Sequence, residues 1–572
     1  MNSALLLLIC IVVFVCAYRI YLRWIARVLD VSDSHPTPAH TRPDGVDYCA
    51  AKMPVLLGHH FSSIAGAGPI VGPIAAAAYG WAPVALWIIV GAVFFGAAHD
   101  FMALIASVRH DGRSIGEVIQ QHLGTLGKTL FLLFCVFSLV LVIAVFAAVV
   151  ATTFVESPAT VMSSLLYMAL AIAFGILVYR CGFSFARVTW LFVPLLALSV
   201  WAGVQFPLAL PAGGVPIPGM ACRIAPQTFW VLLLLAYSFI ASVTPVWILL
   251  QPRDYLSSFL LYALIGLGVA GVFVTQPPLQ IPAFTTFAPA GVGPLFPLLF
   301  VTVACGAISG FHSLVASGTS SKQLDKESDA LPIGAGAMLI EGVLAIVALI
   351  AAARLSTADY TAALQTSGPI NVFARGIGAS VAALGIRESL GTTFGALAVS
   401  AFALTTLDTS TRLCRFCVQE LFARRGRDGR VRQPDRYSTT GVCVIAAAAL
   451  AVSDQWKVIW PVFGAANQLL AALTLAALTL WLAAARKPLW MAFIPMIFMF
   501  AVTVAALCTL CFEKSRILAQ AWSGSAHGAP NVLLTTGVLA GVSLLLLCLA
   551  LLLLLLSCRT FMRLRRAARQ AA

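Results

Sequence analysis

The sequence predicts an all-α polytopic membrane protein with about 15 transmembrane helices. Hydrophobic residues make up 61% of the 572 residues and charged residues only 10%, and the mean hydropathy is +0.97. Apolar runs near the roughly 20 residues that cross a bilayer recur along the chain. The basic residues behind the net charge of +14 lie beside these runs, which indicates membrane topology rather than a nucleic-acid partner.

The apolar runs set the expected order of membrane spans. They cover about 3–22, 58–80, 83–108, 127–153, 160–179, 188–206, 228–250, 258–274, 292–317, 334–353, 389–412, 438–453, 457–482, 489–512 and 532–557. If they alternate across the bilayer with the N-terminus outside, most of the 35 Lys and Arg residues fall at cytoplasmic ends. We therefore expect a cytoplasmic C-terminus and a lipid bilayer around the bundle.

Polar residues interrupt the second run in the stretch GHHFSSIAGAGPI, residues 58–70. Its glycines and proline disfavour a continuous helix, and free backbone groups at membrane depth survive only against protein or a water-filled cavity. Close helix packing explains the glycines but not the histidines and serines. The stretch therefore contributes the predicted substrate-binding residues His59, His60, Ser62, Ser63, Gly66 and Gly68.

Two later stretches repeat this pattern. Ser242, Thr244 and Pro245 interrupt the run at 228–250, where a substrate-binding break and a simple proline bend are both open. The stretch 304–324 carries Ser309, His312 and Ser313, whose hydroxyls suit Na+ and whose imidazole suits a proton. A satisfied interhelical hydrogen bond is the alternative for the histidine.

Single carboxylates inside apolar runs are the remaining candidates for ion coupling, because charge is expensive at membrane depth. Asp100 lies near mid-span beside His99, and Glu341 lies in the first turns of its run, where a cap or ion pair is the alternative. Asp408 either couples an ion or pairs with Arg412 four residues on. The amides Asn467 and Gln468 join the predicted substrate-binding set.

These features predict two inverted repeats of five spans, in which broken helices meet near the bilayer midplane. The predicted units are an N-terminal helix and linker at 1–57, repeats at 58–206 and 228–412, a basic cytoplasmic loop at 413–437, and additional helices at 438–572. The polar stretch at 354–388 is expected to be an external loop, and both a segment that folds back over an entrance and an ordinary surface loop are open.

Several motifs give the sequence a resemblance to a known family. GHHFSSIAGAGPIVGP, HDFMALIASVRHDGRSIGE, SVTPVWILLQPRDY, CGAISGFHS, LTTLDTSTRL and WPVFGAANQLLAAL follow in this order between about residues 50 and 485. The chain resembles the carbon starvation protein CstA family of bacterial inner-membrane transporters. The resemblance implies a LeuT-like core of the APC superfamily with extra helices, and H+-driven uptake of pyruvate or peptides during nutrient starvation.

The predicted function is a secondary active transporter that imports a small carboxylate such as pyruvate by H+ symport. Uptake of peptides or amino acids, with Na+ as the other possible coupling ion, is the alternative. An enzyme is not expected, because adjacent His59 and His60 diverge by about 100° on a helix and neither HExxH nor GxSxG occurs. No metal and no cofactor beyond the coupling ion is predicted, and a passive channel would need a continuous polar path.

Overall fold

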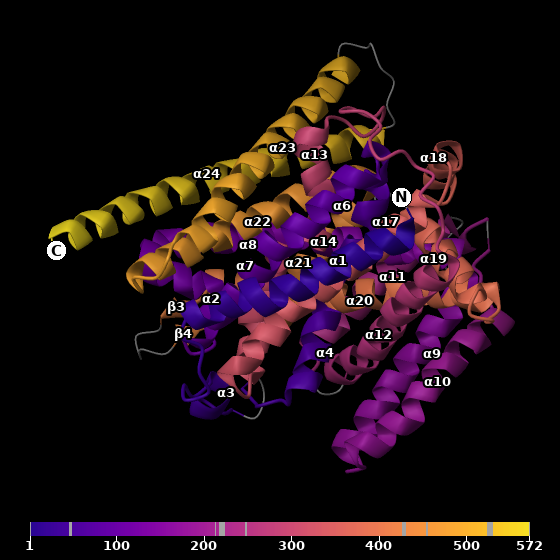
Figure 1. Cartoon of the computed structure of the whole chain (residues 1–572), viewed down its shortest axis with the longest axis horizontal. Helices are drawn as coiled ribbons and strands as arrows, with labels where there is room; N and C mark the ends of the chain where they lie inside the picture. Colours follow the sequence, from indigo (N-terminus) through magenta and orange to yellow (C-terminus); the bar gives the residue numbers. More distant parts are fainter. Residues whose placement is uncertain are drawn as a thin grey trace.

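Figure 1 shows the computed structural model, in which the chain is almost entirely helical and long helices pack side by side. The structure describes residues 2–44, 48–211, 213–216, 223–245, 249–425, 431–452, 456–522 and 530–570. Within these residues, 12 helices are long and apolar enough to cross a membrane, or up to 13 if a bent pair counts as one span. The predicted helical, multi-span class is confirmed.

The N-terminal part of the bundle contains one broken span and several continuous ones. Its elements are α1 (Ser3–Ala17), η1 (Tyr18–Leu22), α2 (Arg23–Val28), α3 (Pro38–Thr41), α4 (Met53–Ile64), α5 (Gly68–Ala76), η2 (Ala77–Tyr79), α6 (Trp81–Val90), η3 (Gly91–Ala97), α7 (Ala98–Val108), α8 (Ile115–Glu156), α9 (Pro158–Gly175), η4 (Ile176–Arg180) and α10 (Phe185–Gln205). The segments on either side of the gap after Ile64 are bent by 46°.

The middle of the chain holds a second, more fragmented span. Its elements are β1 (Val215–Pro216), β2 (Arg223–Ile224), α11 (Pro226–Val243), α12 (Leu250–Thr275), α13 (Leu295–Thr302), α14 (Ala304–Ala307), α15 (Gly310–Val315), η5 (Ala316–Ser320), α16 (Ser321–Gln323), η6 (Glu327–Asp329), η7 (Leu331–Gly336) and α17 (Ala337–Ala353). Strands β1 and β2 form an antiparallel hairpin in which Val215 pairs with Ile224.

The C-terminal part consists of long helices and one further hairpin. Its elements are α18 (Thr357–Thr366), α19 (Gly368–Ala382), α20 (Glu388–Leu421), β3 (Arg424–Arg425), β4 (Val431–Arg432), α21 (Arg436–Ala451), α22 (Trp456–Ala484), α23 (Trp490–Trp522) and α24 (Pro530–Gln570). The hairpin β3–β4 lies in the predicted basic loop at 413–437, and residues 426–430 of that loop lie outside the described residues.

Two predicted spans do not form single long helices. The run at 292–317 is divided among α13, α14 and α15, and the run at 438–453 forms α21, whose 16 residues are short for a span. The predicted span at 228–250 also ends early, because α11 ends at Val243 and the residues from Leu250 belong to α12. The predicted count of about 15 spans is therefore not confirmed.

The segment at 354–388 was expected to be an external loop, and the structure shows that most of it is helical. It forms α18 and α19, and α19 packs against α20 and α12. Ile370, Phe373, Ile377 and Val381 recur at helical spacing and are buried. The polar residues between them concealed this apolar face in a reading based on average hydropathy.

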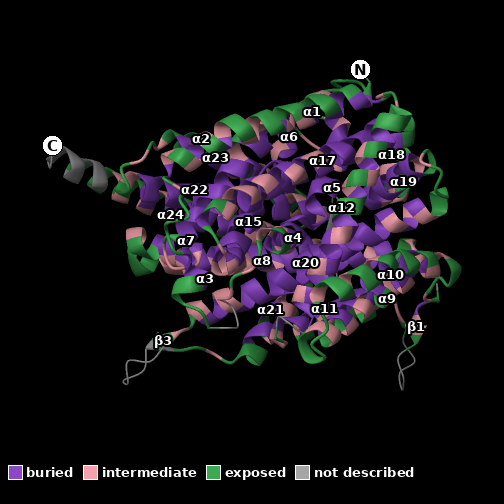
Figure 2. Cartoon of the chain, turned by 60° about the horizontal axis from the view of Figure 1, so that its bottom comes forward, coloured by how far each residue is buried: buried purple, intermediate pink, exposed green. Residues whose placement is uncertain are grey.

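Burial separates an inner group of helices from a peripheral one. Within the most apolar window of each span, α22 is 100% buried and α20 is 83% buried, whereas the windows of α1, α10 and α24 are only 33% buried. Figure 2 shows this as a buried centre with exposed outer helices. The apolar side chains exposed on the peripheral helices are those expected to face lipid.

One face of the molecule carries α3, β3 and β4, and it is called the α3 face here (Figure 1). Polar contacts hold the segment after α2 against this face. Glu327 accepts hydrogen bonds from the backbone N–H of Ser32 and from Nε of Arg109, each at 2.9 Å. Hydrogen bonds from the hydroxyl and backbone N–H of Ser328 lower the pKa of Asp33. These contacts fix the chain between α2 and α4.

Candidate functional site

The first break separates α4 from α5 at residues 65–67. Helix α4 ends at Ile64, and Pro69 at the start of α5 has no N–H to continue the ladder. A side chain on Gly68 would meet Sγ of Cys305 at 2.5 Å, and one on Gly72 would meet the carbonyl oxygen of Thr302 at 2.5 Å. Glycine is required here because α5 lies directly against the second broken span.

The second break separates α14 from α15, where Ile308 and Ser309 adopt extended backbone conformations. The side chain of Asn467 on α22 bonds to the freed groups: its Oδ1 accepts from the N–H of Phe311 at 2.9 Å, and its Nδ2 donates to Oγ of Ser309 at 3.0 Å. One amide therefore holds the break open in place of the helical ladder.

A small cavity of about 10 Å³ lies where the two breaks meet. Its lining includes Gly66, Phe146, Cys305, Ser309, Thr406 and Asn467, which come from both breaks and from α8, α20 and α22. This volume holds about one water molecule. Oγ1 of the buried Thr406 makes no hydrogen bond within the described residues, so a polar group is available to a ligand.

A chain of four buried ionisable side chains lies beside the second break. Nδ1 of His99 lies 2.7 Å from Asp100, whose other oxygen lies 2.7 Å from Nδ1 of His312. Nε2 of His312 is 3.4 Å from Glu341. All four side chains have 0% exposure, and they join α7, α15 and α17. The alternation of imidazole and carboxyl groups allows protons to be held and exchanged inside the bundle.

The predicted residues of α4 take different positions. Nδ1 of His60 lies 2.7 Å from Oγ of Ser320, and Ser62 donates to the carbonyl of Asp254 at 3.0 Å. Ser63 donates within its own helix, to the carbonyl of His59 at 2.9 Å. His60 and Ser62 thus tie α4 to η5 and α12, and none of the three residues lines the central cavity.

The other predicted hydroxyls and amides are also engaged in helix contacts. Ser242 lies 3.4 Å from Thr440 on α21, and Thr244 donates to the carbonyl of Ile240 at 2.7 Å. Neither lines the central cavity. Ser313 donates to the carbonyl of Gly310 at 2.7 Å, and Nε2 of Gln468 donates to the carbonyl of Phe300 at 2.7 Å.

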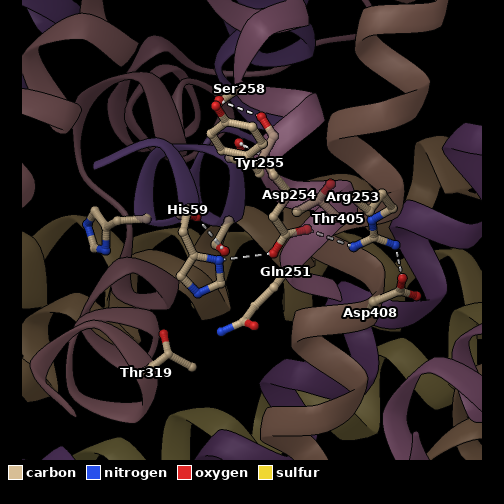
Figure 3. Close-up of polar contacts among 12 residues, drawn as sticks. His59, Gln251, Arg253, Asp254, Tyr255, Ser258, Thr319, Thr405 and Asp408 are labelled. Atoms are coloured by element: carbon tan, nitrogen blue, oxygen red, sulfur yellow. Dashed lines mark hydrogen bonds and ion pairs between the residues drawn. The ribbon is translucent and has the colours of Figure 1, made fainter. Parts of the chain in front are cut away.

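Asp408 belongs to a second buried charge network, shown in Figure 3. Arg253 bonds to Asp408 and to Asp254, the latter at 3.1 Å, and it donates to the hydroxyl of Tyr237 at 2.7 Å. Nδ1 of His59 lies 3.2 Å from the other oxygen of Asp254. The network thus runs from α20 through α12 to α4.

The alternative in which Asp408 pairs with Arg412 is wrong. Arg412 instead donates to the carbonyls of Ala241 and Thr244, at 2.9 and 2.7 Å.

Sequence reasoning also missed Arg253 and Asp254, although adjacent opposite charges beside an apolar run were a visible signal.

A larger cavity, called the vestibule here, opens beside this network and has a volume of about 890 Å³. Its lining includes Cys49, His59, Thr244, Gln251, Arg412 and Arg436. They come from the chain just before α4, from α4 itself, from the junction of α11 and α12, and from α20 and α21, which flank the β3–β4 hairpin in the sequence. We therefore place the vestibule on the α3 face. Among the described residues, no group of three or more His, Cys, Asp and Glu side chains is placed to hold a metal ion.

Comparison with known families assigns the chain to one of them. The model of the family described as carbon starvation protein CstA matches residues 2–366 and 357–506. The chain belongs to the CstA family. The resemblance inferred from the motifs is thereby confirmed.

Curated members of the CstA family include proteins named for two substrates. A peptide transporter CstA of Escherichia coli is 33% identical over 88% of this chain and 80% of its own length. A peptide transporter CstA of Mycobacterium tuberculosis is 33% identical over 90% and 76%. A pyruvate/proton symporter, BtsT of Escherichia coli, is 32% identical over 88% and 81%.

Two solved structures resemble this CstA family chain in fold. A manganese transporter of Eremococcus coleocola, in complex with an aromatic bis-isothiourea compound, has a TM-score of 0.53 and 11% identity, over 91% of this chain and 99% of its own. MhsT in complex with L-phenylalanine has a TM-score of 0.50 and 13% identity, over 80% and 99%. At these identities the likeness concerns the fold alone.

Proposed function

We propose that this protein is a secondary active transporter that imports a small carboxylate such as pyruvate by H+ symport across the bacterial inner membrane. The observation that carries the proposal is His312, which lies between Asp100 and Glu341 and one turn from the second helix break. A proton bound there changes the charge of a buried cluster that contacts the moving elements of such a fold. The relative named pyruvate/proton symporter supports this choice.

We further propose that the core is a five-plus-five inverted repeat. Helix α11 has no interruption between Pro226 and Val243, whereas the span from Leu295 is interrupted at Ile308 and Ser309 and contacts α5 beside the first break. This favours a second repeat that starts at α13 and ends at α22, rather than the repeat at 228–412 expected from the sequence. Helices α1, α11, α12, α23 and α24 then lie outside the two repeats.

Proton coupling is favoured over Na+ coupling by the hydroxyl contacts. Ser309 is bonded to Asn467, and Ser313 is bonded to the carbonyl of Gly310 and lies 3.0 Å from Thr474. A Na+ site would have to replace these contacts. Peptide uptake is the second candidate function, because several relatives are named peptide transporters and the vestibule is large.

The proposal is tested with purified protein in liposomes under an imposed pH gradient. We expect accumulation of labelled pyruvate that an uncoupler abolishes and that an imposed Na+ gradient does not replace. His312→Gln and Asp100→Asn should each lower gradient-driven accumulation at least about tenfold, because the proton-binding group is removed. Both variants should retain pyruvate counterflow, which needs no net proton movement.

Matched measurements separate the alternatives. His110→Gln, which changes a half-buried histidine outside the cluster, should leave accumulation unchanged. Accumulation by His312→Gln and Asp100→Asn at wild-type levels would show that the coupling site is elsewhere. Accumulation of a dipeptide such as alanyl-alanine without accumulation of pyruvate would replace the first candidate function by the second.

A further inference from the structure

The vestibule and the central cavity differ greatly in size and in lining. The central cavity holds about one water molecule, whereas the vestibule has a volume of about 890 Å³. Its walls come from the chain before α4, from α4 itself, from the junction of α11 and α12, and from the facing ends of α20 and α21. A solute that is larger than water therefore has room in the vestibule and not at the centre.

Among the described residues, the side chains of Arg, Lys, His, Asp and Glu type that line the vestibule are all basic. Arg412, Arg415 and Arg436 line it together with His59, and Lys322 lines a smaller adjoining cavity. No Asp or Glu lines either cavity within the part of the chain that the structure describes. A cleft lined by one sign of charge with low-dielectric walls concentrates ions of the opposite sign.

The surrounding structure fixes the positions of two of these guanidinium groups. Arg412 is 9% exposed, and its Nη2 donates to the carbonyls of Ala241 and Thr244 at the end of α11. Arg415, one turn further along α20, is 6% exposed and lies over the ring of Phe416 at 4.6 Å. Preorganised guanidinium groups bind oxyanions well, because little side-chain freedom is lost on binding.

The carboxylate that contacts His59 does not line the vestibule. Asp254 is fully buried behind His59 and bonds to Arg253, as Figure 3 shows. Polar groups without charge, those of Thr244, Gln251 and Gln323, complete the lining. The cavity thus offers hydrogen-bond donors and positive charge together.

We propose that the vestibule is a binding site for small oxyanions, separate from the central cavity. Its ligand is a carboxylate of the transported class or a free phosphate, because both present the oxygens that guanidinium groups bind. The assignment of this site rests on the cavity and on the charges that line it, and it does not depend on proton coupling at His312. It places a second anion-binding position on the α3 face of the transporter.

Cys49 provides a direct probe, because its side chain lines the vestibule. Purified full-length protein is treated with a thiol reagent that carries either a sulfonate or a trimethylammonium group, and mass spectrometry of the Cys49 peptide gives the rate of modification. After correction for rates on a free thiol, we expect the sulfonate to react about tenfold faster, since the positive lining concentrates anions. Pyruvate or inorganic phosphate at millimolar concentration should slow the reaction, and the anion that protects identifies the ligand.

Variants separate this site from a general surface effect. Arg415→Gln with Arg436→Gln should bring the two rates close together and remove protection, whereas Arg187→Gln removes an exposed charge that does not line the vestibule and should change neither. Equal rates in the wild type, no protection by either anion, or no modification of Cys49 at all would each overturn the proposal. Proton-driven pyruvate uptake is measured separately and can persist in all three cases.

Discussion

At the scale of single residues, the most unusual feature is a fully buried arginine that bonds to two carboxylates. Arg253 and its partners Asp254 and Asp408 all have 0% exposure. Taking three charges out of water is expensive, and the arrangement is tolerated because each charge has an opposite partner and further hydrogen bonds, such as that from Tyr237 to Asp408 at 2.8 Å. Removal of one member leaves the others uncompensated.

We predict that Arg253→Met destabilises the protein by about 3–5 kcal/mol, the usual cost of breaking a buried ion pair from one side. Arg253→Met combined with Asp408→Leu should regain part of this loss, because it leaves fewer unpaired charges. The effect is measured as thermal stability in detergent, monitored by size-exclusion chromatography. Arg187→Gln at an exposed site is the control, and equal stability of Arg253→Met and wild type would contradict the prediction.

At the scale of elements, the two breaks differ in how visible they are in the sequence. Gly66, Gly68 and Pro69 signal the first break locally, and the structure places it there. The second break falls at Ile308 and Ser309, between Gly306 and Gly310 in the polar stretch 304–324. It is stabilised by Asn467, which lies 158 positions from Ser309. Local composition therefore marked this stretch as polar, but it did not show that the helix breaks there or that Asn467 stabilises the break.

The packing of α15 on α22 gives a test at this scale. A side chain on Gly310 would collide with backbone atoms of Ala471 and Asn467, which cannot rotate away. Gly310→Ala should therefore force the two helices apart, abolish transport and destabilise the protein by about 1–3 kcal/mol, as overpacking does. Uptake and thermal stability are the measurements.

Gly541→Ala on α24 is the matched control, because an added Cβ there meets nothing within 4 Å. Its stability should stay within about 0.5 kcal/mol of the wild type. Full activity of Gly310→Ala would show that the contact between α15 and α22 opens easily.

At the scale of the whole molecule, composition predicted the class well and the path of the chain less well. Average hydropathy found the long helices, but it could not place the end of α11 at Val243 or find the helix α19 in a polar segment. It also missed the network of Arg253, because the partner Asp408 is 155 positions away. Such contacts depend on which helices become neighbours, and periodicity does not encode this.

Topology provides a prediction at the largest scale. The two termini lie on opposite sides of the molecule, and the C-terminal helix ends toward the side of α2 and β3 (Figure 1). Together with the distribution of basic residues, this predicts an external N-terminus and a cytoplasmic C-terminus. Alkaline phosphatase fused before residue 2 should be active, and a fluorescent protein fused after the C-terminus should fluoresce. An inactive phosphatase at the N-terminus, or a fluorescent protein at the C-terminus that does not fluoresce, would contradict the assignment.

The size of the space between the two breaks affects how binding measurements are read. Because Gly66, Phe146 and Thr406 leave room for about one water molecule, a solute can occupy the centre only in molecules whose helices have already separated. The dissociation constant observed for such a solute is the intrinsic constant divided by the fraction of molecules in the separated form. Weak binding by the purified protein would therefore measure how rarely that form is populated, even if every contact in it is favourable.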